Sequence, residues 1–445
     1  MNALGIIGLI VGLGLLIYLA YKNFNLIFFT PLCCLLIGLA NRMNLVELIT
    51  QQYMVGFNAM VKNMFFVFVL GTIFAEIYER TGAALSISNA IYNVFTINSR
   101  KKAVAGQSVE LKPFVGIAIV YVMCISLAYG GIGALIITLV VMPVVVDIFK
   151  KCKLPREMIP GCVLGAVAAA VPSMPGTTSD QNVLASILLG TNAMVAPVIG
   201  FIGGIFVLLL NYGTMTYLGN RNISKGNVFT ANDEEVEPSG DKSGPHWLVA
   251  FLPMVLMFIT YNALKQNILT ALLVGIVLAI LLFWKHLNGL RGFMELLPSA
   301  ITRSGMLTLM GSSLSGLGTV VSATPVFPIL TSGLLNLGLP PLYKASIAIM
   351  LVVGIAGGAP SGLSIALPIF KETFMSMGIG LQELHRISVF SSQTLDTLPT
   401  NAALQIVNGM ARTIMTKSYK YIFITTVLNT ILGALLVTTL FQIFG

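Results

Sequence analysis

Charged residues are scarce in this sequence of 445 residues, since Asp, Glu, Lys and Arg together make up only 9% of it. Soluble domains carry about 25%. Hydrophobic residues reach 56%, and the mean hydropathy is +0.91. The composition excludes an ordinary soluble domain and predicts an all-α polytopic membrane protein. Since a span needs roughly 20 apolar residues and lipid-exposed backbone must bond to itself, we expect about ten to fourteen helical membrane elements.

Motifs of several other protein classes are also missing. The five cysteines show no metal-binding spacing. The sequence has no HExxH zinc motif, no GxSxG nucleophile elbow and no GxxxxGK[ST] loop for ATP. We therefore expect no enzyme, no metal and no cofactor. The net charge of +9 comes largely from basic residues in short loops such as 98–106 and 150–157, which is typical of cytoplasmic loops and does not indicate nucleic-acid binding.

One polar segment, residues 218–245, interrupts the apolar pattern. It is rich in Gly, Asn and Ser and contains a cluster of acids. Such a composition is typical of a flexible linker. We therefore expect a first membrane half at residues 1–217 and a second at residues 246–445.

The two halves are interrupted in the same order. A glycine-rich break, at 129–133 in the first half and 357–362 in the second, is followed at nearly equal distance by a proline break, at 171–182 and 395–405. Paired interruptions at corresponding positions indicate an internal repeat, and they are the best sequence signal for the central site of a transporter.

Each proline break predicts a helix that starts inside the membrane. Proline removes a backbone donor and disfavours helical geometry in the residue before it. We predict Ser173 and Thr397 as N-caps, with Pro175 and Pro399 in or near the first turn of the new helices. Unwound backbone at this depth must line a protein-enclosed cavity, and helix N-termini bind anions. The breaks therefore predict two parts of one substrate or ion site.

Compact hydroxyl, amide and glycine residues cluster around the breaks and suit a small carboxylate that carries hydroxyl groups. The candidate substrate-binding residues are Ser173, Thr177, Thr178, Gln181, Asn182, Gly130, Gly131, Ser361, Ser364, Thr397, Thr400 and Asn401. Lys and Arg lie almost wholly in expected loops or at span ends, so an anion would be bound by helix ends and neutral donors. The alternative is that the hydroxyls only repair backbone around proline kinks.

Acids within membrane segments are costly, and are therefore functional candidates by default. Asp396, Asp180 and Glu76 are the candidates for proton coupling, which needs a group that changes its protonation state during the cycle. The three histidines, among them His385, lie at the ends of apolar segments and are expected at the membrane interface.

The sequence resembles the gluconate permease (gluconate:proton symporter) family of the ion-transporter superfamily. The resemblance covers nearly the whole chain, and its most specific parts are residues 56–84, 174–200, 357–367 and 395–407. The family pattern Asp-Thr-Leu-Pro-His is matched from Asp396 to Pro399, but Thr400 replaces the histidine.

This resemblance implies a secondary active transporter in the bacterial inner (cytoplasmic) membrane that takes up a small organic acid by proton symport. The acid would be a sugar acid or a short hydroxy acid, as in the hydroxybutyrate-like branch. The superfamily further implies two inverted repeats, helical hairpins at the substrate, an elevator-like motion and a possible homodimer. A sodium-coupled carboxylate symporter or a sodium/proton antiporter of the same superfamily is the alternative.

Overall fold

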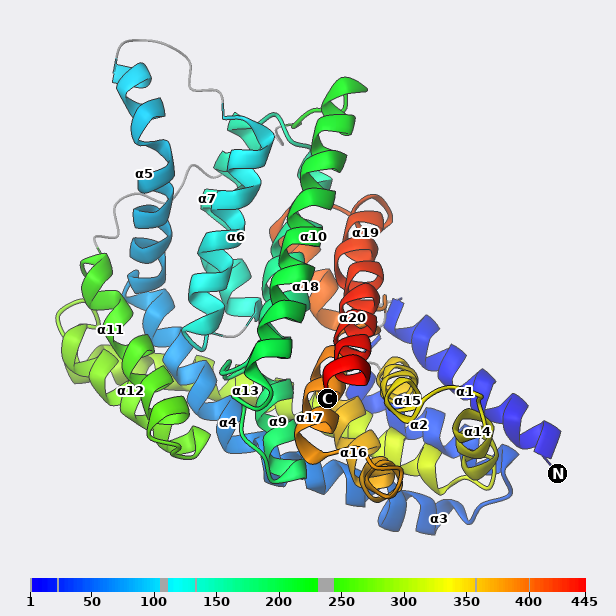
Figure 1. Cartoon of the computed structure of the whole chain (residues 1–445). Coiled ribbons are helices and arrows are strands. Elements are labelled where there is room, and N and C mark those ends of the chain that lie inside the picture. The colour runs from blue at the N-terminus through cyan, green and yellow to red at the C-terminus, as the bar shows by residue number, and fades with distance from the viewer. Residues whose placement is uncertain are drawn as a thin grey trace.

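The computed structural model describes residues 2–21, 24–104, 111–132, 134–230, 244–356, 358–399 and 401–445, and in these ranges the regular structure is helical with no strands (Figure 1). The prediction of an all-helical chain is confirmed. Part of the expected linker, residues 231–243, lies outside the described residues. Helix α10 continues to Ser224 and so occupies the first part of the segment that the composition assigned to the linker.

The first half contains two apolar helices, then the long helix α4, and then a series of shorter pieces that ends in the long helix α10. Their bounds are α1 Asn2–Tyr21, α2 Leu26–Ala40, α3 Leu45–Glu47, a π-helical turn Leu48–Tyr53, α4 Met54–Arg80, α5 Ala83–Val104, α6 Pro113–Tyr129, α7 Ala134–Lys151, a 3-10 turn Arg156–Met158, α8 Ile159–Leu164, a π-helical turn Gly165–Ala170, a 3-10 turn Val171–Ser173, α9 Asp180–Leu189 and α10 Pro197–Ser224.

The second half has its elements in a parallel order. Their bounds are α11 Trp247–Phe258, a π-helical turn Ile259–Ala263, α12 Ile268–Leu282, α13 Gly289–Ala323, α14 Phe327–Leu335, α15 Pro341–Ala356, α16 Ala359–Ser376, α17 Leu381–Ser392, α18 Ala402–Met410, α19 Met415–Phe423, a π-helical turn Ile424–Leu428 and α20 Asn429–Phe444. In each half a helix pair around the glycine break precedes a helix pair around the proline break. This order agrees with an internal repeat.

Four helical stretches are long and apolar enough to cross a membrane. They are Leu45–Arg80, Pro197–Ser224, Gly289–Ala323 and Met415–Phe444. In this list the first and third occupy the same place in their halves, and so do the second and fourth. Six shorter apolar helices accompany them, which is the length distribution expected when many membrane helices are interrupted.

Helices α4 and α13 pack against each other along their lengths and run in opposite directions, since Gly56 lies against Ser315 near one end and Thr72 bonds to Ala300 O near the other. In Figure 1 they cross the lower part of the molecule, while α5, α6, α7 and α10 rise from it. A Cβ on Gly56 would meet Ser315 O at 2.4 Å, so glycine permits the close approach of the two helices.

The segments after the two proline breaks exchange partners between the halves. Helix α9 of the first half packs against α16 and α17 of the second, and α18 of the second half packs against α7 and α8 of the first. This reciprocal packing brings the two proline breaks into the interior of the bundle.

Candidate functional site

The first proline break is a loop that precedes α9. Ser179 is the N-cap of this helix, because its Oγ accepts a hydrogen bond from Asn182 N at 3.3 Å and donates one to Pro172 O at 2.7 Å. The prediction of Ser173 as N-cap is wrong. Gly176 has φ +78°, which ends any helical path after Pro175, and the helix starts only at Asp180.

The second proline break is longer than the sequence suggested. Helix α17 ends at Ser392 and α18 begins at Ala402, so the prediction of Thr397 as N-cap is wrong. The reason is a tertiary contact: Asp396 Oδ1 accepts the backbone N–H of Ala359 at 2.7 Å, at the start of α16. Asn401 Nδ2 donates to Asp396 O at 3.0 Å and holds the loop in this path.

The structure brings the segments that carry Asp180 and Asp396, one from each half, into the same region. Helix α9, which Asp180 starts, packs against α16, and Asp396 accepts the first backbone N–H of α16. Asp180 is the first residue of α9, and Asp396 caps α16. Both residues are half-buried, so neither is fully enclosed by the protein.

The glycine breaks approach the same place. Gly131 has φ +85°, and a Cβ there would lie 3.1 Å from Thr178 Oγ1. A Cβ on Gly358 would lie 3.8 Å from Asp396 Oδ1. We call the region bounded by Gly131, Thr178, Asp180, Gly358 and Asp396 the central site.

The remaining candidates of the first half are mostly engaged within the protein. Asn182 is fully buried and donates through Nδ2 to Met174 O at 2.8 Å and to Thr177 Oγ1 at 2.5 Å. Gly130 caps the end of α6. Gln181 is half-buried and Ser173 is fully buried. These contacts support the loop itself, so Thr178, Asp180 and Gln181 are the candidates of this segment that keep accessible surface.

The candidates of the second half show the same division. Thr397 is buried, with its hydroxyl against that of Thr426. Ser364 Oγ donates to Pro360 O at 2.9 Å. Thr400, Gly133 and Gly357, and the side chain of Ser361, lie outside the described residues.

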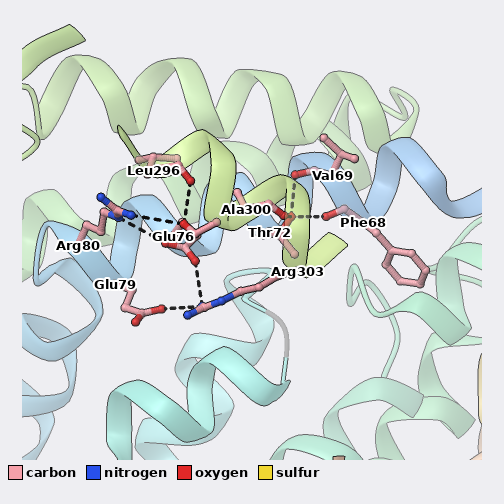
Figure 2. Close-up of polar contacts among 10 residues, drawn as sticks. Phe68, Val69, Thr72, Glu76, Glu79, Arg80, Leu296, Ala300 and Arg303 are labelled. Atoms are coloured by element: carbon pink, nitrogen blue, oxygen red, sulfur yellow. Dashed lines mark hydrogen bonds and ion pairs between the residues drawn. The ribbon is translucent and has the colours of Figure 1, made fainter. Parts of the chain in front are cut away.

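Glu76 lies apart in a charged network between α4 and α13 (Figure 2). Its side chain is 3% exposed; Arg303 Nη1 lies 2.9 Å from Oε1 and Arg80 Nε 3.5 Å from Oε2. Arg303 Nη1 also donates to Glu79 Oε2 at 3.1 Å, so its contact with Oε1 of Glu76, an oxygen with no well-angled hydrogen bond, is electrostatic. Within the described residues, Glu76 forms ion pairs with these two arginines.

The sequence did not predict that Arg386, which donates several hydrogen bonds, lies in the protein interior. His385 and Arg386 were expected in a loop at the interface, but both are fully buried in α17. Arg386 Nη1 donates to Ser173 O at 2.8 Å, and His385 Nε2 lies 3.2 Å from Asn182 Oδ1. The expectation that Lys and Arg lie almost wholly in loops or at span ends therefore fails for Arg386.

A local signal was present for the helix that carries these two residues, though not for their burial. Glu383 Oε2 accepts the N–H of Gly380 at 3.1 Å, an N-terminal capping arrangement that starts α17 at Leu381. A helix start at that position places His385 and Arg386 one turn inside the helix.

Comparison with known proteins supports a membrane transporter. No protein-family model matches the sequence. The chain is 26% identical over an alignment of 472 residues to the uncharacterized transporter YxjC of Bacillus subtilis (strain 168), which covers 95% of this chain and 96% of the relative. The crystal structure of the Alcanivorax borkumensis YdaH transporter has a similar fold, with a TM-score of 0.55, 13% identity and 89% coverage of each chain. The chain thus has a transporter fold, and these relatives are transporters rather than enzymes.

Proposed function

We propose that the protein is a secondary active transporter that takes up a small organic acid, a sugar acid or a short hydroxy acid, by proton symport. The observation that carries this proposal is the pairing of Asp180 with Asp396, which come from different halves and both lie at helix N-termini inside the bundle.

The electrostatics of such a pair couple a proton to an anion. Two neighbouring carboxylates inside a protein resist simultaneous ionisation, so the pair tends to hold a proton. A doubly ionised pair would also repel an organic anion. The anion therefore binds favourably only when the pair is protonated, and the two species cross together.

The central site also offers groups for the anion itself. The N-terminus of α9 presents free backbone N–H groups and the positive end of the helix dipole. Thr178 and Gln181 add donors that are not buried. The missing side chain at Gly358 leaves space beside Asp396 Oδ1, whereas Met257 packs into the space beside Gly131. These features suit a small carboxylate with hydroxyl groups.

Sodium coupling is the second candidate. The same two carboxylates, with hydroxyl and backbone carbonyl oxygens of the breaks, could hold a sodium ion instead of a proton. A sodium-coupled carboxylate symporter or a sodium/proton antiporter would use that arrangement. The proposal places the protein in the bacterial inner (cytoplasmic) membrane as a multi-pass protein, with an elevator-like motion and a possible homodimer, as the family resemblance implies.

Reconstitution tests the proposal. Purified protein in proteoliposomes should accumulate one or more members of a panel of short hydroxy, keto and sugar acids when a pH gradient is imposed. Accumulation that follows a sodium gradient and ignores the pH gradient would select the sodium alternative. Flux that never exceeds equilibration under either gradient would rule out secondary active transport of these acids.

A further inference from the structure

A buried arginine of the second half binds backbone carbonyls on both sides of α9, the short helix of the first half. Arg386 Nη1 donates to Ser173 O, before α9, at 2.8 Å. Its Nη2 donates to Ala193 O and Val195 O, after α9, at 2.8 Å each. The planar guanidinium presents five donors in a rigid fork and is suited to bridging separate acceptors, whereas an ammonium group is a compact point charge with three donors.

A buried arginine of the first half makes a related contact with the second half. Arg156 is 4% exposed, and its Nη1 lies 3.5 Å from the carbonyl oxygen of Ala411. Ala411 directly follows α18, as Ala193 follows α9 by a short loop. The guanidinium carbon of Arg156 also lies 4.8 Å from the centre of the Phe229 ring.

The two arginines occupy corresponding places in the halves. Arg156 starts the 3-10 turn Arg156–Met158 that leads into α8, the helix before the first proline break, and Arg386 lies in the second turn of α17, the helix before the second. Helix α8 packs against α18 and α19, while α17 packs against α9 and its Arg386 reaches Gly200 near the start of α10. Each arginine thus reaches across to the turn that follows the other half's short helix.

The two turns lie at different levels of the bundle. In Figure 1, α9 lies at the foot of the molecule beside the start of α10, whereas α18 and α19 lie higher, beside the middle of α10. The central site contains the start of α9, at Asp180. Arg386 holds the turn after α9 against the loop that leads to Asp180, because it donates to Ser173 O on one side and to Ala193 O and Val195 O on the other.

We propose that Arg386 and Arg156 are equivalent positioning residues, each of which holds the turn after the other half's short helix closed toward one face of the membrane. This role rests on the proposed function, because a turn that closes toward one membrane face is useful only in a transporter. In the part of the chain that the structure describes, Arg386 donates hydrogen bonds to carbonyl and amide oxygens only. Such neutral partners can be exchanged for water more readily than a carboxylate partner, which suits a contact that opens and closes.

Thiol labelling tests this without any substrate. The five native cysteines are buried, so they react slowly or can be replaced. Ala193 and Ala411 are also buried, and Ala193→Cys or Ala411→Cys keeps the carbonyl that the arginine binds. A membrane-impermeant maleimide is added to oriented vesicles from either face, and the labelling rate is measured for each thiol in each arginine background.

The expected result is reciprocal and specific to one face. Arg386→Gln should speed labelling at position 193 by at least about fivefold, roughly 1 kcal/mol in the opening equilibrium, from one face only. Arg156→Gln should do the same at position 411 from the opposite face. Faster labelling at both positions in both variants, at neither position, or from the same face would overturn the proposal.

Two further variants guard against a trivial outcome. Arg386→Lys keeps the charge but lacks the forked donors that reach both flanks of α9, so it should label like Arg386→Gln; wild-type labelling would show that the bridging geometry is unimportant. It also replaces Arg386→Gln if that variant fails to fold. Arg291→Gln, at a side chain 88% exposed, is the matched control and should change nothing. Because labelling needs no transport, failure of the proposed transport function and failure of the proposed arginine contacts give different results.

Discussion

Two groups of acids inside the helical bundle have opposite surroundings. Glu76 is 3% exposed, and both of its oxygens face arginines, at 2.9 and 3.5 Å. Asp180 and Asp396 lie in the region where α9 packs against α16, and Asp396 accepts a backbone N–H at the start of α16. The sequence ranked all three as proton-coupling candidates, because each is an acid within an apolar segment.

We expect the two groups to differ in whether they take part in coupling. Glu76 already has counter-charges beside it, at Arg80 and Arg303. It therefore serves the packing of α4 on α13. Mutual repulsion of two ionised aspartates is unfavourable, and binding of a proton or a sodium ion would relieve it. Burial alone does not mark a coupling residue; the charge of its neighbours does.

The largest expected effect comes from Asp396→Asn, which removes the repulsion and the proton-carrying group together. A pH gradient of one unit supports about tenfold accumulation when one proton moves with each anion, so the ratio should fall from about ten to about one. If Asp396 carries the proton, substrate exchange across the membrane persists; if it is a fixed acceptor, exchange is lost as well. Uptake and counterflow in proteoliposomes measure both.

Asp180→Asn is the matched variant from the other half, and we expect it to impair accumulation too, because it removes the other carboxylate of the pair.

Wild-type accumulation by Asp396→Asn under a pH gradient would rule out both roles for Asp396. The coupling group would then have to be sought at Asp180 or Glu76.

The next effect is on stability. Glu76→Gln removes the charge that faces Arg80 and Arg303, and breaking a buried ion pair costs about 3–5 kcal/mol. Because both arginines are partly exposed, at 39% and 42%, we expect a loss nearer about 1–3 kcal/mol. Thermal unfolding in detergent measures it. Arg303→Gln in the same chain should recover part of the loss, and accumulation per folded molecule should stay normal in both.

That prediction separates the two groups of acids most directly. Loss of accumulation in a Glu76→Gln protein that is folded and stable would place Glu76 in the coupling path and remove the distinction.

A third comparison concerns backbone geometry at the central site. Gly131→Ala forces a left-handed conformation, φ +85°, on a residue with a side chain, at about 1–2 kcal/mol. The new methyl would also meet Met257 Cε at 2.0 Å and Thr178 Oγ1 at 3.1 Å. Gly378→Ala, at φ +89° with nothing within 4 Å, carries the same strain and none of the contacts. Uptake should fall in the first variant only; equal uptake would show that Gly131 lies outside the working site.

The helical class was predictable from the sequence because it depends on composition and run length, which are local. The glycine and proline breaks were predictable for the same reason, and they lie where the chain unwinds at Gly131 and at Pro175. The exact helix starts were not. Asp396 was expected beside the start of its own helix, but its carboxylate is taken by Ala359 N, 37 positions earlier in the chain.

The burial of Arg386 was hidden for a related reason. A cation in a segment of mixed polarity is normally placed at the membrane surface. Its burial depends on carbonyl oxygens at Ser173, Ala193 and Val195, which are supplied by the other half of the chain. No window of sequence around Arg386 contains those partners, so single-sequence reasoning could place the break but not the group that holds it.

The smallest expected effect belongs to the outer member of the ion network. Glu79→Gln removes a 3.1 Å contact to Arg303, but the two side chains are 25% and 42% exposed. Exposed pairs contribute about 0–1 kcal/mol and weaken as salt rises. Arg303 keeps its contact with Glu76, so the variant should unfold within about 1 kcal/mol of the wild type, and the small difference should shrink in high salt. The larger loss in Glu76→Gln should persist there. A Glu79→Gln loss as large as that of Glu76→Gln would mean that burial does not separate the two glutamates.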